Sequence, residues 1–297
     1  MSALHPIVAV TGSSGAGSAS VKRAFEHIFT AAGVNAAAVE GDSFHRFDRE
    51  DMHIEVGRAA GRGETLTHFG PAGNLLPELE ALFAGYAEHG RGRQRTYVHT
   101  EDEAVLHGVA PGRFTDWRDL PEPTDLLFYE GLHGGFVGDE ADIARHVDLL
   151  IGMVPIVNFE WAQKIHRDRA VRGYSTEAAT AMILRRMPDY VHYICPQFSR
   201  TDINFQPVPT IDTSNPFILE ELPSYDESMV VIHVQNRAKL NPDYPYLLGM
   251  LDGAFVSKMD TLVVPASRLS FAMELLLLPV IERLVATRTA ALDQSAA

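Results

Sequence analysis

An apolar strand that runs through a glycine-rich turn into a helix is the feature that most constrains this chain. The run PIVAVT at residues 6–11 is followed by GSSGAGSAS at residues 12–20, and a helical pattern occupies residues 18–32. Glycines permit the backbone angles and close approach that such a turn needs. Free N–H groups and the positive end of the helix then point to one place, which favours phosphate. The segment predicts an α/β fold with an anion site at the end of its first strand.

The turn departs from the common phosphate-binding loop G-x-x-x-x-G-K-[ST], because Ser18 replaces the lysine and Ala19 the following hydroxyl. Two other interpretations compete with phosphate binding. One is a plain strand-to-helix connection, and the other is a dinucleotide site with Glu40 binding the ribose. The dinucleotide site is disfavoured because Ser20 occupies the last position of its glycine pattern, and no tyrosine is followed four residues later by lysine. If the turn binds phosphate, residues elsewhere must supply the positive charge.

Apolar runs alternate with helical patterns through the first two thirds of the chain, as in βαβ units around a parallel sheet. We expect strands at residues 6–11, 36–40, 125–129 and 147–155, and helices at 18–32, 75–89, 159–172 and 176–190. Later strands at 208–212, 229–234 and 261–265 indicate antiparallel additions near the C-terminus, before a packed helix at 270–285. Without a linker or repeat, we expect one domain over residues 1–297. The aperiodic segment 91–123 is expected to help cover a ligand.

Composition excludes several functional classes. The net charge of −14 argues against general binding of nucleic acid or an anionic membrane, because such binding needs a basic surface. The single cysteine, Cys195, excludes an internal disulfide and a cysteine-rich metal site, which suits a reducing cytoplasm. No stretch approaches the roughly 18 to 20 apolar residues that span a bilayer. An anionic ligand must therefore meet a local basic patch.

Two expected strands end in carboxylates that should meet at the ligand-binding edge of the sheet. The second strand leads into EGDSFHRFDRED, with Asp42 followed by His45, Arg46 and Arg49, and a third leads through LLFY into Glu130. Asp42 can accept a proton from a substrate hydroxyl, or it can simply cap a turn. Glu130 is placed as a magnesium ligand would be, and the glycines that follow it indicate close approach to a ligand.

A basic segment answers the need for local positive charge. Residues 164–186 hold six lysines and arginines against Asp168 and Glu177, inside a strongly acidic chain. On a helix, Lys164, Asp168 and Arg172 are spaced four apart and share one face. Such a face can hold a transferred phosphate and a metal together, and a helix of this kind can close as a lid. The alternative is a surface helix with ordinary ion pairs.

Taken together, these stretches resemble one family over nearly the whole chain. They are VTGSSGAG, EGDSFHRF, RTYVHTEDEA, PGRFTDWRD, LLFYEGLHG, KIHRDRAVRGYS, PQFSRTDINFQ and DTSNPF. In order and spacing they resemble the phosphoribulokinases of bacterial type. The resemblance implies a P-loop kinase fold related to adenylate and uridine kinases, with a loop that lacks the usual lysine. It also implies transfer of phosphate from ATP to D-ribulose 5-phosphate, giving ribulose 1,5-bisphosphate and ADP in the Calvin cycle.

The resemblance also implies a role for each matching residue. Asp42 would be the general base, with Lys164 supplying charge at the transferred phosphate and Arg167 supporting it from the lid. Glu130 and Asp168 would engage the Mg²⁺ of MgATP. The residues that would hold ribulose 5-phosphate or lie near it are His45, Arg49, Tyr97, His99, Arg172 and Arg186. The nucleotide would lie against Gly12, Ser13, Ser14, Gly15, Ala16, Gly17, Ser18, Ala19 and Ser20.

The resemblance further implies a homo-oligomer that is activated by NADH and inhibited by AMP. The arginines associated with those effectors are absent, with Thr30, Ala31, His233 and Gln235 in the corresponding segments, so the sequence leaves effector control open. Ala19 replaces a family hydroxyl, and we expect weaker use of MgATP, compensated in part by Ser20. Two alternatives also stay open: a kinase for another small alcohol, such as uridine or a different sugar phosphate, and a nucleotide-binding relative with weakened catalysis.

Overall fold

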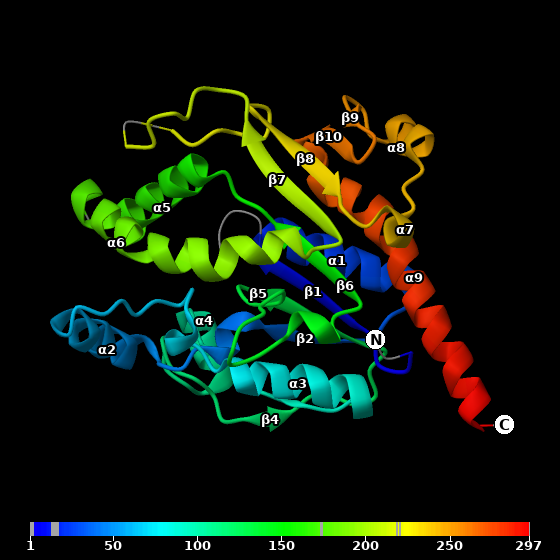
Figure 1. Cartoon of the computed structure of the whole chain (residues 1–297), viewed down its shortest axis with the longest axis horizontal. Helices are drawn as coiled ribbons and strands as arrows, with labels where there is room; N and C mark the ends of the chain where they lie inside the picture. Colours follow the sequence, from blue (N-terminus) through cyan, green and yellow to red (C-terminus); the bar gives the residue numbers. More distant parts are fainter. Residues whose placement is uncertain (1–2, 13–17, 173–174, 218, 220, 297) are drawn as a thin grey trace.

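A twisted sheet runs through the molecule and carries helices on both faces (Figure 1). The computed structural model describes residues 3–12, 18–172, 175–217, 219 and 221–296, without the side chains of 18, 19, 167–172, 295 and 296. Within these residues the sheet has eight strands in the order β2-β5-β1-β6-β7-β8-β10-β9. The parallel strands are β1 (Ile7–Gly12), β2 (Ala36–Glu40), β5 (Leu126–Gly131), β6 (Leu149–Met153) and β7 (Ile203–Pro209). The antiparallel strands are β8 (Ser228–Val234), β9 (Phe255–Lys258) and β10 (Thr261–Pro265).

The central strand β1 is buried on both faces, which explains why its sequence is continuously apolar. Val8 and Val10 face one hydrophobic cluster, which contains α1 (Ser18–Ala32) and the first half of α9 (Leu269–Ala296). On α1 the buried residues Val21, Ala24, Phe25 and Ile28 follow the helical repeat, so that one stripe meets the sheet. Ile7 and Ala9 face the second cluster, which is covered by α3 (Leu76–His89).

The remaining helices lie mainly around the ends of the strands. They are α2 (Arg49–Gly61), α4 (Glu101–His107), α5 (Val157–Arg172), α6 (Thr176–Asp189), α7 (Arg237–Leu240) and α8 (Tyr244–Met250). Short turns of helix occur at Gly41–Phe44 (η1), Pro71–Gly73 (η2), Ala144–His146 (η3), Tyr190–Ile194 (η4), Cys195–Ser199 (η5) and Ala266–Arg268 (η6). Among the described helices, the long α9 included, none combines the length and apolar character needed to cross a bilayer.

The expected α/β architecture, with a mainly parallel sheet and antiparallel strands near the C-terminus, is confirmed. The bounds of α1, β2 and β10 agree with the sequence pattern. The bounds predicted for the strand at 208–212 are wrong. Strand β7 begins at Ile203 and ends at Pro209, where it pairs with Ser228. Prolines at 207 and 209 disguised this strand, since proline removes a ladder donor. The short β9 was not expected at all.

Helix α2 was also missed, because it buries few residues. Only Met52 and Ala59 of its thirteen residues are buried, so its apolar period is weak. Its start is set by Asp48, whose carboxylate accepts a hydrogen bond from the N–H of Asp51. The expected aperiodic segment 91–123 contains α4 and a two-stranded ribbon of β3 (Arg93–Gln94) and β4 (Arg118–Asp119). This segment therefore forms a structured insertion beside α2 and not an irregular loop.

Two glycines allow the ends of β2 and β5 to close tightly. A Cβ added to Gly131 would lie 2.5 Å from the hydroxyl of Tyr129 and 2.6 Å from the Cα of Gly41. A Cβ at Gly41 would likewise lie 2.6 Å from the Tyr129 hydroxyl. The buried Tyr129 ring therefore fills the space that side chains at 41 and 131 would need. This packing fixes where the chain leaves β2.

The substitution Gly131→Ala tests that constraint. We expect it to lower the free energy of unfolding by about 1–3 kcal/mol, as overpacking typically does. Chemical denaturation measures the change. The matched control is Gly57→Ala in α2, where an added Cβ meets nothing within 4 Å and helix propensity favours alanine. A Gly131→Ala protein as stable as the unchanged chain would show that the strand ends are not closely packed.

Candidate active site

The carboxyl ends of three neighbouring parallel strands bring the expected turn and the two acids to one edge. In the register of the sheet, Glu130 lies between Val10 of β1 and Glu40 of β2. Gly12 ends β1, and a Cβ there would overlap the carbonyl oxygen of Met153 on β6. Helix α1 then begins at Ser18 and includes Ala19 and Ser20. The expected nucleotide residues Ser13, Ser14, Gly15, Ala16 and Gly17 lie outside the described residues.

Asp42 lies in the turn η1, directly after β2, and is bracketed by two imidazoles. Its Oδ1 is 3.1 Å from Nε2 of His45, and its Oδ2 is 3.3 Å from Nε2 of His99. Burial alone would raise the pKa of Asp42, but the hydrogen bond and charge of His45, together with the charge of His99, outweigh it and lower that pKa. The carboxylate therefore stays ionised at neutral pH and can accept a proton.

The segment before α4 brings His99 to Asp42 and Tyr97 to the rings of His45 and His99. The backbone of Tyr97 forms an isolated antiparallel β-bridge with Phe114. The centroid of the Tyr97 ring lies 4.8 Å from that of His99 and 6.4 Å from that of His45. Thr100 caps α4 by accepting the N–H of Glu103, whose side chain in turn accepts the N–H of His99. Two motifs far apart in the sequence thus meet around one carboxylate.

Arg95 holds the η1 turn from the other side, and no sequence pattern pointed to this role. Its guanidinium donates to the carbonyl oxygens of Ser43 at 2.9 Å and His45 at 2.6 Å. The same group lies 3.6 Å from the ring centroid of Phe114 and 5.0 Å from that of Trp117. Arg95 therefore fixes the backbone that presents Asp42 and His45. Arg95 lies in the motif RTYVHTEDEA, but only the fold shows that it binds the carbonyl oxygens of Ser43 and His45.

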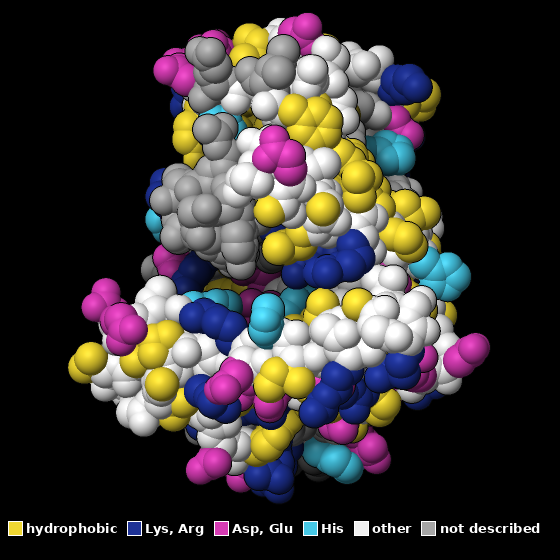
Figure 2. All heavy atoms as spheres, turned by 90° about the vertical axis from the view of Figure 1, so that its left-hand side faces the viewer, with side chains coloured by type: hydrophobic (Ala, Val, Ile, Leu, Met, Phe, Trp, Pro, Cys, Tyr) yellow, Lys and Arg dark blue, Asp and Glu magenta, His cyan; other side chains and the backbone are white. Residues whose placement is uncertain are grey.

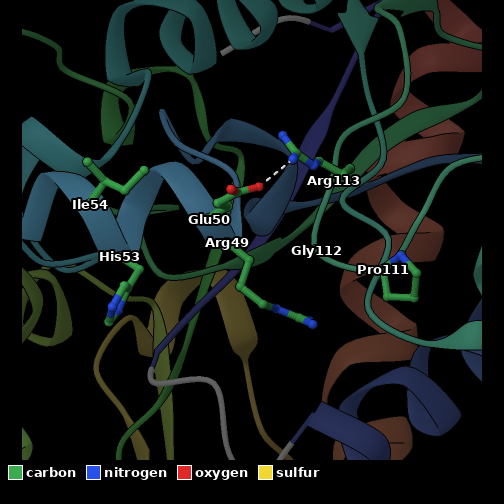
Figure 3. A pocket seen from close by; sticks show the side chains of 7 residues that line it. All are labelled: Arg49, Glu50, His53, Ile54, Pro111, Gly112 and Arg113. Atoms are coloured by element: carbon green, nitrogen blue, oxygen red, sulfur yellow. Dashed lines mark hydrogen bonds and ion pairs between the residues drawn. The ribbon is translucent and has the colours of Figure 1, made fainter.

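Arg49 opens α2 and lines a pocket of about 610 Å³ with His53, Ile54 and the turn Pro111–Arg113 (Figure 3). Among the described residues, its guanidinium forms no hydrogen bond or ion pair. The flanking acids form ion pairs with Arg113 instead. Nη1 of Arg113 lies 2.5 Å from Oδ2 of Asp48, and Nη2 lies 2.6 Å from Oε2 of Glu50. Figure 3 shows Arg49 pointing away from that ion pair. The arrangement leaves Arg49 available to an anionic ligand.

Helices α5 and α6 carry the expected basic segment. They pack against each other through Ile165, Ala179 and Ile183, and they lie across from α2 and α4 in Figure 1. Lys164 is partly buried on α5, and the charge of Arg186 on α6 reaches the ring of His68. The side chains of Arg167, Asp168 and Arg172 lie outside the description. Figure 2 shows the molecule hollowed across the middle of the face in view, with basic side chains on both margins of the hollow and histidines along its lower margin.

The glycines after Glu130 have close neighbours inside the protein, and their expected approach to a ligand stays a prediction. Gly134 lies against Ala9 and Tyr129, and Gly135 lies against Leu150 and Gln197. Gln197 accepts hydrogen bonds from Thr11 and from the N–H of Gly135, and its amide donates to the carbonyl oxygen of Leu132. His133 is buried, and its Nε2 donates a hydrogen bond to the carbonyl oxygen of Phe69 at 3.0 Å.

Glu130 supplies the oxygen donor that magnesium prefers, and it stands beside the turn that begins at Gly12. Magnesium in kinases is commonly held by one or two carboxylates together with substrate phosphates, so Glu130 fits a metal that arrives with a nucleotide. Within the described part of the chain, no group of three or more histidine, cysteine or acidic side chains has the geometry of a complete metal site.

Two histidines near Asp42, the partly buried His68 and the buried His133, make stability depend on pH. Burial lowers the pKa of His68 to about 3 and that of His133 to about 4. The unfolded chain binds protons at these residues below about pH 6.5, while the folded chain does not. The free energy of unfolding should therefore fall from about pH 6.5 to about pH 4, by up to about 1.4 kcal/mol per pH unit for each histidine.

Denaturation at a series of pH values checks this expectation. The variant His133→Gln keeps a donor for the carbonyl oxygen of Phe69 but cannot titrate, so its stability should fall less steeply with acid. An unchanged slope in this variant would show that His133 does not cause the loss.

Comparison with known proteins places the chain in a family. The model described as "Phosphoribulokinase / Uridine kinase family" matches residues 7–214. A protein named phosphoribulokinase from Nitrobacter vulgaris is 55% identical over 282 residues, covering 95% of this chain and 97% of that protein. Phosphoribulokinase 1 of Cereibacter sphaeroides is 55% identical over 286 residues, covering 96% of this chain and 98% of that protein.

A solved structure is similar as well. The phosphoribulokinase from Rhodobacter spheroides matches with a TM-score of 0.89 and 52% identity, covering 97% of this chain and 100% of the solved chain. The resemblance inferred from the sequence motifs is thereby confirmed. On the matched family model, the near full-length relatives and the shared fold, this chain belongs to the phosphoribulokinase/uridine kinase family.

Proposed function

We propose that this chain transfers the γ-phosphoryl group of ATP to D-ribulose 5-phosphate, giving ribulose 1,5-bisphosphate and ADP in the Calvin cycle. The observation that carries the proposal is the position of Asp42. Its carboxylate follows β2, beside the strand ends that lead to the glycine-rich turn, and between the imidazoles of His45 and His99. Relatives more than 50% identical over nearly their whole length bear the name phosphoribulokinase, which supports the choice of acceptor.

Asp42 would act as the general base at the acceptor hydroxyl. The carboxylate takes the proton of the C1 hydroxyl, and the electron pair of that O–H bond forms the new bond to the γ-phosphorus. The bond from that phosphorus to the oxygen bridging the β-phosphate breaks, and its electron pair stays on ADP. The lowered pKa of Asp42 supports this role, because the carboxylate is ionised before the substrate binds. Tyr97 and His99 would line the sugar beside it.

Arg49 would bind the 5-phosphate of the sugar, together with Arg172. A guanidinium matches the oxygens of a phosphate in a bidentate manner, and Arg49 stands at the first position of α2, where the helix dipole adds positive potential. Arg113 pairs with both Asp48 and Glu50, which would otherwise compete for Arg49. A phosphorylated acceptor therefore fits this site better than a neutral alcohol such as uridine does.

The nucleotide would lie at the start of α1, against residues 12–20. Glu130 and Asp168 would hold Mg²⁺ with the phosphates of ATP, and the metal supplies charge neutralisation there. Lys164, Arg167 and Arg186 would bring positive charge from α5 and α6, which replaces the lysine that the turn lacks. We propose that these helices close as a lid, and that the enzyme works as a cytoplasmic homo-oligomer, as the family resemblance implies.

Acceptor specificity tests the proposal most directly. ADP release should occur with ribulose 5-phosphate and be near the background level with uridine or without an acceptor. D-ribulose, which lacks the 5-phosphate, is the matched control substrate. The unchanged enzyme should show a much higher kcat/KM for ribulose 5-phosphate than for D-ribulose. This ratio should shrink in an Arg49→Gln variant, because that variant loses the partner of the phosphate. Turnover with uridine would favour the other alcohol kinase, and absence of turnover with every acceptor would favour a relative with weakened catalysis.

A further inference from the structure

Asn74 connects a buried loop to the imidazole beside the proposed base. Its side-chain NH₂ donates to the carbonyl oxygens of His68 at 2.8 Å and Gly70 at 2.7 Å. Both amide hydrogens are thereby used, and the residue is buried. Because two carbonyl oxygens can only accept, the amide nitrogen must face them, and the amide oxygen faces Nδ1 of His45 at 3.0 Å. The orientation of the amide is therefore fixed by its partners.

This orientation determines which nitrogen of His45 carries a proton. The oxygen of Asn74 can only accept, so Nδ1 of His45 must donate. The other nitrogen, Nε2, lies 3.1 Å from Oδ1 of Asp42. If His45 were neutral, Nε2 would present a lone pair to a carboxylate, which is repulsive. The contact between Asp42 and His45 is attractive only when a proton lies between them.

We propose that Asn74 is a positioning residue that fixes the tautomer of His45, so that His45 donates to Oδ1 of Asp42 as an imidazolium and the acceptor hydroxyl is served by Oδ2, which also faces His99. The role in catalysis rests on the proposed function. When the hydroxyl of the sugar loses its proton, that proton binds Oδ2 and the proton on Nε2 stays in place. His45 thereby orients the carboxylate through a charged hydrogen bond, and Asn74 acts only through His45.

The surroundings allow His45 to be the cation of this cluster. The ring of His68 stacks on that of His45 at 4.0 Å between centroids, and burial holds the pKa of His68 low, so that it stays neutral. The buried ring of His133 behaves in the same way. The titratable or charged groups that act on His45 are Asp42, His68, Tyr97, His133 and, at its backbone oxygen, Arg95, while His99 faces Asp42 and the charge of Arg186 acts on His68.

The state of the His45 ring can be observed directly in the free enzyme. Nitrogen-15 NMR of the full chain with labelled histidine, assigned by a His45→Gln variant, distinguishes the two tautomers and the imidazolium. We expect Nδ1 of His45 to carry a proton because it faces the oxygen of Asn74, and Nε2 to carry one as well while it donates to Asp42. A neutral ring protonated on Nε2 would overturn the proposal. This measurement needs no substrate, so it stands even if the proposed function fails.

A pair of variants tests the consequence for catalysis. In Asn74→Leu the ring is free to place its neutral proton on Nε2 and donate to Asp42 without an extra charge. The alkaline limb of kcat/KM should therefore move to higher pH, while kcat at neutral pH falls by up to about 10²-fold because the ring loses its support. An alkaline limb at the same pH as in the unchanged enzyme would overturn the proposal.

Thr67→Val is the matched control. Thr67 is also buried and holds the same loop, through Asp189 and the N–H groups of Phe69 and Gly70, and among the described hydrogen bonds its side chain has none to His45. We expect Thr67→Val to leave the alkaline limb in place, whatever it does to stability. An equal shift in both variants would mean that loop distortion causes the effect and would refute the role of Asn74. If the unchanged enzyme fails to phosphorylate ribulose 5-phosphate, the proposed function is wrong and the NMR measurement alone decides about Asn74.

Discussion

The close approach of Gly41 and Gly131 is the constraint on which the candidate site depends. The chain leaves β2 and β5 side by side because Tyr129 and two glycines fill the same small space. Asp42 follows one of these glycines and Glu130 precedes the other, so the packing that closes the sheet edge also sets where both carboxylates stand. Parallel pairing of β1 with β5 and β6 then places the glycine-rich turn next to them.

Charged side chains around that edge are also arranged by local contacts. The chain is acidic as a whole, yet Asp48 and Glu50, which flank Arg49 in the sequence, are both paired with Arg113, and Asp42 is faced by imidazoles. Two further histidines are kept neutral by burial, so His68 stacks on His45 and His133 lies in the same region without adding charge. A region able to receive phosphates is thus built locally within a molecule that would repel them at long range.

The sequence predicted those parts of the molecule that depend on local pattern. The continuous apolar run of β1 and the helical stripe of α1 are local signals, and the acids at the ends of β2 and β5 follow once the strands are parallel. The roles of Asn74 and Arg95 could not be predicted, because their contacts with His45 join residues 29 and 50 positions apart. Prolines hid β7, and weak burial hid α2. The roles assigned to the site residues stay predictions, those of Asp42, Glu130 and Lys164 as much as those of Arg167, Asp168 and Arg172.

The central claim is that Asp42 is placed and ionised to take the proton of the acceptor hydroxyl. The most direct test is the single-turnover rate of Asp42→Asn with saturating ATP and ribulose 5-phosphate, measured together with the dissociation constant of ATP. The account predicts a rate lower by about 10²–10⁴-fold with ATP binding unchanged, because a missing base affects the transition state and not the nucleotide. A rate equal to that of the unchanged enzyme would contradict the account.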